Sequence, residues 1–190
     1  MGRFLHEGAA VHPSSNALFL TEDQKDALFY RYLPNKPGKL SKGRLQCLTV
    51  RGDKEADLRN WETISIGPGE KRTVSWVTLK DVNRKKDDLR LIGREKGGLP
   101  FANLEGVFQS GGDIYFAATN GGAKKQGQIW RYLPSPFEGT PREEEEPGRL
   151  ELMFESPSTS VLEHPDQMTR TPWGTCSSVR MVTAISFLWD

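Results

Sequence analysis

The sequence lacks the features that mark disulfide-rich, membrane-spanning and nucleic-acid-binding proteins. Its two cysteines, Cys47 and Cys176, provide neither a disulfide framework nor a zinc-ligand spacing. No apolar run approaches the ~20 residues that a membrane-spanning helix needs, and the N-terminus shows no basic-then-apolar export leader. Lysine and arginine total 26 against 25 for aspartate and glutamate, so the net charge is only +1. We therefore expect no nucleic-acid partner and no membrane insertion.

Recognisable nucleophile and nucleotide motifs are also missing. There is no GxSxG pentapeptide that would place a serine on a strand-to-helix turn. The glycine pairs at 97–98 and 121–122 are not followed by a helix with a Lys-Ser or Lys-Thr pair, so neither is a phosphate-binding loop. Any catalysis must therefore use another kind of site.

Turn-forming residues are abundant, which indicates an all-β protein. Glycine and proline contribute 19 and 12 residues, while hydrophobic residues make up only 36% of the chain. This balance is typical of short strands joined by many turns.

A four-part pattern occurs twice in the same order. It consists of an acidic residue followed by glycine, an apolar strand ending in threonine, an aromatic strand ending in Leu-Pro, and a strand that opens with Gly-Arg-Leu. The two copies match at 7–8 and 105–106, 19–21 and 115–119, 30–34 and 130–134, and 43–46 and 148–151. A repeat of this length indicates a repeated structural unit.

Four strands joined in sequence form a β-meander, which is the unit of a propeller blade. We therefore predict one all-β domain over residues 1–190, a partial β-propeller. Its expected parts are a first blade at 1–50, an insertion or irregular blade at 51–98, a second blade at 99–156 and the start of a third at 157–174. The open edges of an incomplete propeller favour self-association.

Less regular segments carry weaker predictions. In the insertion, Trp61 and residues 76–79 indicate a strand pair, and residues 87–95 fit a short helix. Residues 34–43 and 134–148 read as loops. The run Glu143–Glu146 should repel itself and be mobile, and we assign it no role.

The first acidic residues of the three units are the candidate site: Glu7, Glu105 and Asp166. Inner strands of a propeller begin at one mouth of the central channel, so these carboxylates should converge there. Converging carboxylates suit a hard cation that takes oxygen ligands. The alternative is that each one caps a turn or lies at a solvated strand end.

Other polar residues are weaker candidates. Residues 22–23 offer a further acidic pair, although a charged hairpin tip is the better interpretation. His6 is either a ligand or phosphate donor or a structural residue. His12 precedes a proline and fits a turn, His164 should contact the site if Asp166 does, and Cys47 should be a small buried hydrophobe.

The ensemble of motifs resembles the PhoX-type alkaline phosphatases and their uncharacterised bacterial relatives. The resemblance covers most of residues 1–174, and the segments that carry it are MGRFLHEGAAVHP, LFLTEDQKDALFYRYLP, LEGVFQSGGDIYFAATNGG, GQIWRYLP and HPDQMTRTPWG. It implies a β-propeller that hydrolyses phosphate monoesters with iron and calcium, bound by carboxylates and one cysteine. Intact relatives are often exported by the twin-arginine route.

Carried over residue by residue, the resemblance implies that Glu7 and Glu105 are metal ligands and that Asp166 lies near the same mouth. Some relatives have an arginine that could bind phosphate two residues before the second glutamate, where this chain has Asn103. The substitution weakens the case for phosphate binding at that position.

Two larger departures concern the ends of the resemblance. Relatives carry an earlier TPWGTW-type segment with the cysteine ligand, and they continue through a strand similar to LxLCEDG. Here residues 175–190 are TCSSVRMVTAISFLWD, and a frameshift after Gly174 would restore a sequence like that of the family. On this hypothesis Cys176 is no ligand, and the chain is a phosphatase fragment that is inactive on its own.

Two other functions stay open at this point. One is a non-catalytic propeller that binds a partner or arises as a truncated product. The other is a calcium-dependent lactonase-like propeller, which would use similar carboxylates.

Overall fold

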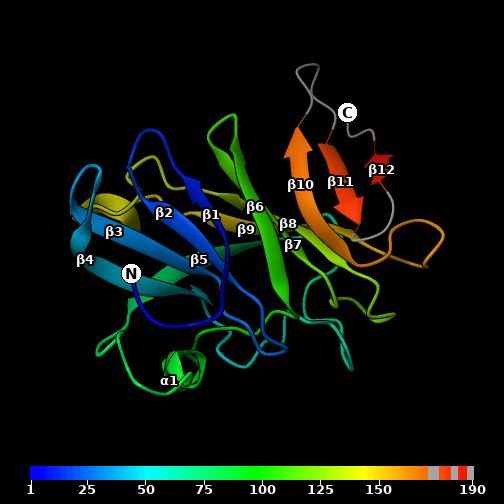
Figure 1. Cartoon of the computed structure of the whole chain (residues 1–190), viewed down its shortest axis with the longest axis horizontal. Coiled ribbons are helices and arrows are strands. Elements are labelled where there is room, and N and C mark those ends of the chain that lie inside the picture. The colour runs from blue at the N-terminus through cyan, green and yellow to red at the C-terminus, as the bar shows by residue number, and fades with distance from the viewer. Residues whose placement is uncertain (171–175, 181–183, 188–190) are drawn as a thin grey trace.

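Figure 1 shows a chain built almost entirely of strands, with a single α-helix at one edge of the described part. The computed structural model describes residues 1–170, 176–180 and 184–187. The two meanders predicted from the repeat are present. The first comprises β1 (His6–Val11), β2 (Leu18–Glu22), β3 (Tyr30–Lys36) and β4 (Lys39–Val50). The second comprises β6 (Leu104–Ser110), β7 (Asp113–Ala118), β8 (Gln128–Leu133) and β9 (Arg149–Glu155).

A ninth strand joins the two meanders into one antiparallel sheet. The strand order is β1-β2-β3-β4-β5-β9-β8-β7-β6, and β5 (Lys71–Thr78) comes from the insertion. One part of β5 pairs with β4, and its first three residues pair with β9. The sheet curves until β1 lies beside β6, so it is nearly closed. The molecule is thus an all-β partial propeller.

The insertion differs in part from the expected structure. The predicted strand pair is wrong, because Trp61 lies in a bend and only β5 is a strand. The expected short helix is present as α1 (Leu89–Glu95). The predicted loop at 34–43 is instead the continuous β3–β4 hairpin, in which Lys36 pairs with Lys39.

The core lies between the facing surfaces of the two meanders. Phe19 and Phe29 from the first meander and Phe116 and Trp130 from the second are fully buried there. The rings of Phe29 and Phe116 stack with centroids 4.1 Å apart. Because aromatic side chains bury large apolar areas, this contact fixes how the two meanders sit against each other.

The segment between β8 and β9, which the sequence predicted to be a loop, contains a short helix. Pro141–Glu144 form a 3-10 helix, η1, in which Thr140 accepts a hydrogen bond from the Arg142 N–H. Glu143 forms an ion pair with Arg31 of the first meander. The carboxylates do not simply repel one another, because arginines from elsewhere in the chain neutralise part of the charge.

A second sheet follows the nine-stranded one. It has the antiparallel order β10-β11-β12, with β10 (Pro165–Arg170), β11 (Cys176–Arg180) and β12 (Ala184–Phe187). β10 lies against β6 and β7. β11 and β12 fall within the predicted out-of-frame tail, whose other residues lie outside the described part of the chain.

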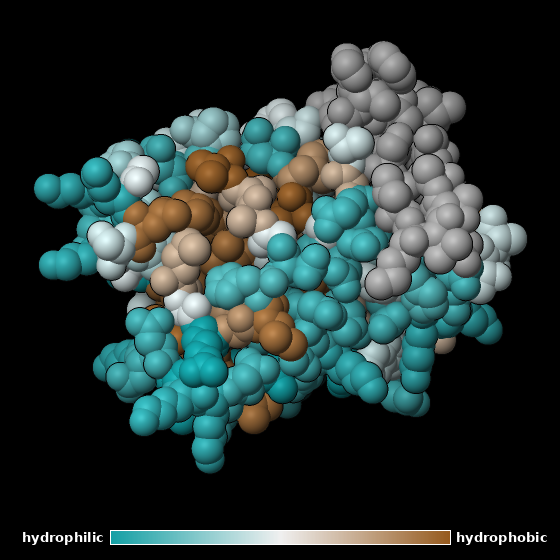
Figure 2. All heavy atoms as spheres, in the orientation of Figure 1, coloured by the Kyte–Doolittle hydropathy of each residue, from teal (hydrophilic) through white to brown (hydrophobic). Residues whose placement is uncertain are grey.

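The surface carries one visible apolar area. Figure 2 shows hydrophobic side chains gathered over β1 and β2 and surrounded by hydrophilic ones. Leu5 and Val11, at the two ends of β1, are 50% and 55% exposed. In the described part of the chain, no helix combines the length and apolar character needed to cross a membrane.

Candidate metal centre

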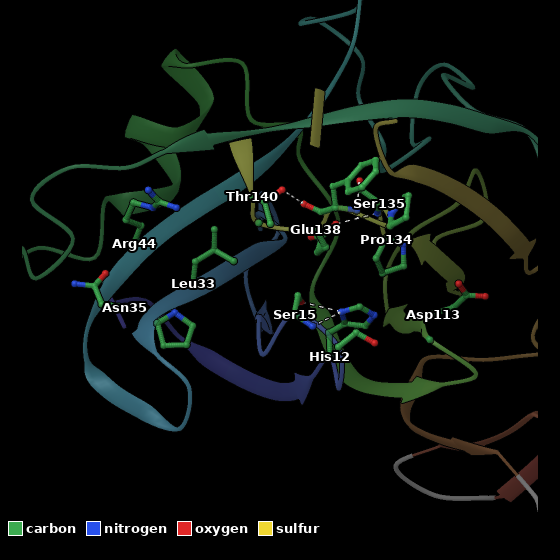
Figure 3. A pocket seen from close by; sticks show the side chains of 16 residues that line it. His12, Ser15, Leu33, Asn35, Arg44, Asp113, Pro134, Ser135, Glu138 and Thr140 are labelled. Carbon is green, nitrogen blue, oxygen red and sulfur yellow. Dashed lines mark hydrogen bonds between the residues drawn. The ribbon is translucent and has the colours of Figure 1, made fainter. Parts of the chain in front are cut away.

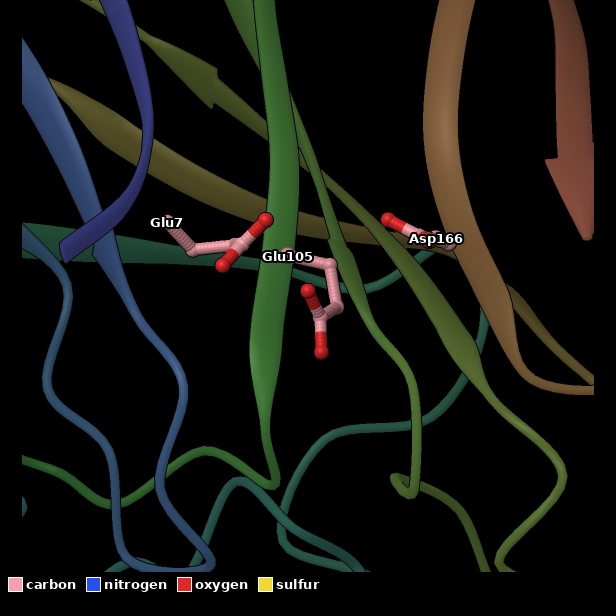
Figure 4. A group of neighbouring side chains, drawn as sticks. All are labelled: Glu7, Glu105 and Asp166. Atoms are coloured by element: carbon pink, nitrogen blue, oxygen red, sulfur yellow. The ribbon is translucent and has the colours of Figure 1, made fainter. Parts of the chain in front are cut away.

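Three carboxylates meet where the first meander, the second meander and the three-stranded sheet come together. Glu7 is on β1, Glu105 is on β6 and Asp166 is on β10, and Figure 4 shows the side chains gathered between the strands. One carboxylate oxygen from each residue lies within 4.8 Å of the other two. The three residues are the ones that the sequence repeat selects.

Each of these carboxylates lies at an irregularity in its strand. The pairing register shifts between His6 and Ala9 on β1 and between Leu104 and Val107 on β6, around the two Glu-Gly pairs. On β10 it shifts between Pro165 and Gln167. An extra residue in one strand bends it and redirects a side chain. The same device therefore places all three carboxylates.

The glycine after each glutamate allows the neighbouring strand to come close. A Cβ atom on Gly8 would lie 3.1 Å from the Glu105 carbonyl oxygen and 2.7 Å from the Val107 side chain. A Cβ atom on Gly106 would lie 2.6 Å from the Asp166 carbonyl oxygen. The Glu-Gly pair thus supplies a carboxylate and also the space for the strand that carries the next one.

A threonine at the end of the second strand of each meander donates a hydrogen bond to the backbone of the next unit, and we call this contact the clasp. The Thr21 hydroxyl donates to the Glu105 carbonyl at 2.5 Å and accepts from the Gly8 N–H at 2.7 Å. The Thr119 hydroxyl donates to the Pro165 carbonyl at 2.6 Å. Both threonines hold the backbone beside a carboxylate, so the repeat carries the clasp as well as the acidic residue.

The electrostatics of the cluster favour a bound cation. Burial, followed by the charges of Asp23, Glu7 and Asp166, raises the pKa of Glu105 to about 8. Burial, Asp166 and Asp23 also raise the pKa of Glu7. Like charges this close oppose one another's ionisation until a cation or protons neutralise them.

Asp23 is a member of this region that the repeat does not identify. Its carboxylate accepts a hydrogen bond from Asn103 Nδ2 at 2.8 Å, and Asn120 Nδ2 in turn donates to Asn103 Oδ1 at 3.1 Å. Asp23 is half-buried, and its charge acts on both glutamates. The repeat misses it because the second meander has only polar residues at this place.

Glu22 is not part of a charged hairpin tip, so that interpretation is wrong. Its side chain is fully buried and accepts hydrogen bonds from the Leu28 N–H at 3.0 Å and the Tyr30 hydroxyl at 2.9 Å. Burial raises the pKa of Glu22 to about 7. It braces the turn that carries Asp23.

The histidines differ in their roles. His6 stacks on Phe4 with centroids 3.6 Å apart and contacts the Gly2 carbonyl, which is a structural role. His12 hydrogen-bonds Ser15 within the turn after β1, as expected. His164 Nδ1 lies 3.3 Å from the Thr119 carbonyl, two residues before Asp166. Because a carbonyl only accepts, Nδ1 carries the proton, and Nε2 is the acceptor of the neutral ring.

A cavity of about 740 Å³ lies at the ends of β1 and β6 that are opposite the carboxylates. Figure 3 shows that it is lined by the turn after β1, around His12, and by the segment after β8, around Ser135 and Glu138. Glu138 is buried and accepts hydrogen bonds from Arg31 at 2.5 Å and Tyr132 at 2.7 Å. At this cavity the Glu138 carboxylate is thus neutralised by Arg31.

The donor set of the carboxylate cluster fits a hard cation such as calcium, because it consists of oxygen atoms from three carboxylates. Among the described side chains no thiol joins it. Cys47 is fully buried in the core and burial raises its pKa to about 12, which agrees with its expected role as a small hydrophobe. The side chain of Cys176 lies outside the described residues.

Fold and site together define a partial β-propeller with three carboxylates gathered between its units. The chain belongs to the alkaline phosphatase PhoX family, whose model matches residues 1–178. Among solved structures it is similar to one described as Pseudomonas fluorescens PhoX in complex with vanadate, a transition state analogue. The similarity has a TM-score of 0.60 and 14% identity, and it covers 93% of this chain and 39% of that one. The comparison with curated proteins found no match.

Proposed function

We propose that this chain contributes a cation-binding carboxylate centre to a PhoX-like phosphatase that acts on phosphate monoesters. The observation that carries the proposal is the convergence of Glu7, Glu105 and Asp166, whose oxygens lie within 4.8 Å of one another. Family membership supports the reaction class. The chain spans 39% of the length of the solved PhoX chain, so the activity of the whole protein is part of the proposal.

Calcium is the cation that the described donors favour, and the resemblance adds iron. When bound, such a cation would polarise the phosphoryl oxygens and neutralise charge that develops during hydrolysis. The protein's own residues hold the centre in shape. Thr21 and Thr119 fix the strand backbones, and the Asn103 amide keeps Asp23 oriented beside the glutamates.

The first experiment is a calorimetric calcium titration of the purified chain and two variants. Wild type is expected to bind calcium, and Glu105→Gln should bind at least about tenfold more weakly because one charged ligand is lost. The matched control is Glu62→Gln, which changes an exposed glutamate outside the cluster. An equal loss in both variants, or no binding by wild type, would contradict the proposal.

Hydrolysis is the second measurement. We expect slow or no turnover of para-nitrophenyl phosphate by this chain alone, because the cysteine ligand implied by the resemblance is not among its described groups. Any turnover that is measured should disappear in Glu105→Gln. Lactone turnover instead would favour the lactonase, and calcium binding with no role in hydrolysis in a longer relative would favour the binding protein.

A further inference from the structure

A second cavity, of about 450 Å³, lies beside the carboxylate cluster. Its lining includes Lys25, Trp61, Asn103, Asn120, Lys125 and His164. None of these side chains belongs to the group of three carboxylates. The cavity therefore offers a different chemistry from the centre that it borders.

The backbone connects this cavity directly to the cluster. Asn103 stands two residues before Glu105, and His164 stands two residues before Asp166. Both have left-handed backbone conformations, with φ of 50° and 48°, which few residues other than glycine adopt. Asn103 also donates to Asp23 at 2.8 Å. A ligand in the cavity would thus lie next to the cation centre.

The cavity carries positive charge that no ion pair among the described residues neutralises. Among the described residues, neither Lys25 nor Lys125 takes part in an ion pair. By contrast Arg59, the other cation near Trp61, is paired with Asp57 at 2.6 Å. Two ammonium groups without a carboxylate partner in the described part of the chain are suited to an anionic ligand.

One of these lysines is held in place by an aromatic ring. The Lys125 ammonium lies 4.9 Å from the centre of the Trp61 ring, within the range of a cation–π interaction. Trp61 is itself fixed, since its Nε1–H donates to the Asn120 carbonyl at 2.6 Å. The position of the Lys125 charge is thus tied to the same segment, residues 119–120, that contacts His164 and Asn103.

We propose that Lys25 and Lys125 bind a second anionic group of the substrate, so that the site prefers phosphate esters bearing another phosphate or a carboxylate. This inference rests on the proposed function, because it assumes that the first phosphate binds at the carboxylate centre. The proposal also accounts for the neutral side chain of Asn103, because the two lysines, and not residue 103, supply the positive charge next to the centre.

The test compares two ligands that differ by one phosphate, fructose 1,6-bisphosphate and fructose 6-phosphate. Their affinities for the calcium-loaded chain are measured by calorimetry, in wild type, Lys125→Met and Lys124→Met. Lys124 is the matched control, because it is an exposed neighbour that does not line the cavity. Wild type and Lys124→Met should bind the bisphosphate about fivefold to tenfold more tightly, and Lys125→Met should lose most of that preference.

Two results would overturn the inference. Equal weakening of both ligands in Lys125→Met would show that the lysine holds the common phosphate, and equal affinities in wild type would show that no second subsite exists. The indole Nε1–H resonance of Trp61, assigned with Trp61→Phe, provides an independent readout. It should respond to the bisphosphate more than to the monophosphate, and a response of equal size would count against the subsite.

The calcium titration separates this inference from the proposed function. Calcium binding without a preference for the bisphosphate would sink the inference and leave the function standing. If calcium does not bind but the Trp61 resonance still responds to the bisphosphate in a Lys125-dependent way, the function fails and the anion site stands.

Discussion

Two groups of carboxylates in this molecule differ in where their positive charge comes from. Around Arg31, the side chains of Glu138 and Glu143 surround a guanidinium that is only 2% exposed. At the junction of β1, β6 and β10, none of the three site carboxylates forms an ion pair with a lysine or arginine among the described residues.

The difference separates a structural joint from the proposed cation site. The Arg31 group ties the first meander to the segment after β8, and it neutralises itself with residues of the chain. Burial, followed by the neighbouring acidic charges, raises the pKa values of Glu7 and Glu105, and protons or an added cation would neutralise the cluster. Substitutions in the Arg31 group or in the site, compared with and without calcium, test this difference.

The largest effect is expected from Arg31→Met. The substitution leaves the buried Glu138 without its cation, and removing one partner of a buried ion pair typically costs about 3–5 kcal/mol. Urea unfolding should show this loss with and without calcium. Arg142→Met is the control, since this exposed arginine pairs with Glu145 at the surface and should change stability by less than about 0.5 kcal/mol. If calcium restored the stability of Arg31→Met, the distinction between the two groups of carboxylates would be wrong.

Glu105→Gln should act with opposite signs in the two metal states. Without calcium it removes a repelling charge, so the free energy of unfolding should rise by roughly 1 kcal/mol after allowance for solvent screening. With calcium the variant should be less stable than wild type, because a ligand is lost. Thermal unfolding in chelator and in millimolar calcium measures both, and loss of stability in both states would mean a purely structural role.

The pH dependence of the metal-free chain follows from the raised pKa values. A carboxyl with a raised folded-state pKa binds a proton more tightly when folded, so its stabilising effect is present at low pH and is lost as pH rises. For Glu105 the loss spans its ordinary value of 4.5 to about 8, and for the buried Glu22 it spans 4.5 to about 7. Unfolding between pH 4.5 and 8.5 should show this decline.

Calcium and one variant divide that decline into its two sources. Calcium should remove the Glu105 part, since it replaces protons at the centre. Glu22→Gln should remove the other part whether or not calcium is present, because its side chain lies among Leu28 and Tyr30. A profile that neither change flattens would show that other groups control the titration.

The smallest effect is expected from Thr21→Val. It removes the hydroxyl that joins Gly8 to the Glu105 carbonyl, which should cost about 1 kcal/mol and weaken calcium binding a few-fold. Thr169→Val, on an exposed position of β10, is the control. If calcium affinity does not change while stability falls, the clasp supports the fold and not the centre.

The repeat predicted the two meanders and selected the three acidic residues, because the acidic residue and the strand pattern recur together in the sequence. It could not reveal Asp23, whose equivalent in the second meander is not acidic. It also missed the Arg31 group, since Glu138 and Glu143 lie 107 and 112 residues away along the chain. The sequence indicates only repulsion within the run of glutamates, because Arg31 and Arg51, which pair with Glu143 and Glu144, are remote along the chain.

The clasp formed by each threonine has a consequence for how such a centre grows. Each of the three units brings a carboxylate on its first strand, and for the second and third units the threonine of the preceding unit supplies the hydroxyl that holds the backbone beside it. If the proposed centre binds a cation, a further unit with the same Glu-Gly pair and threonine would bring one more carboxylate oxygen to the same ion, so the number of oxygen donors would follow the number of units.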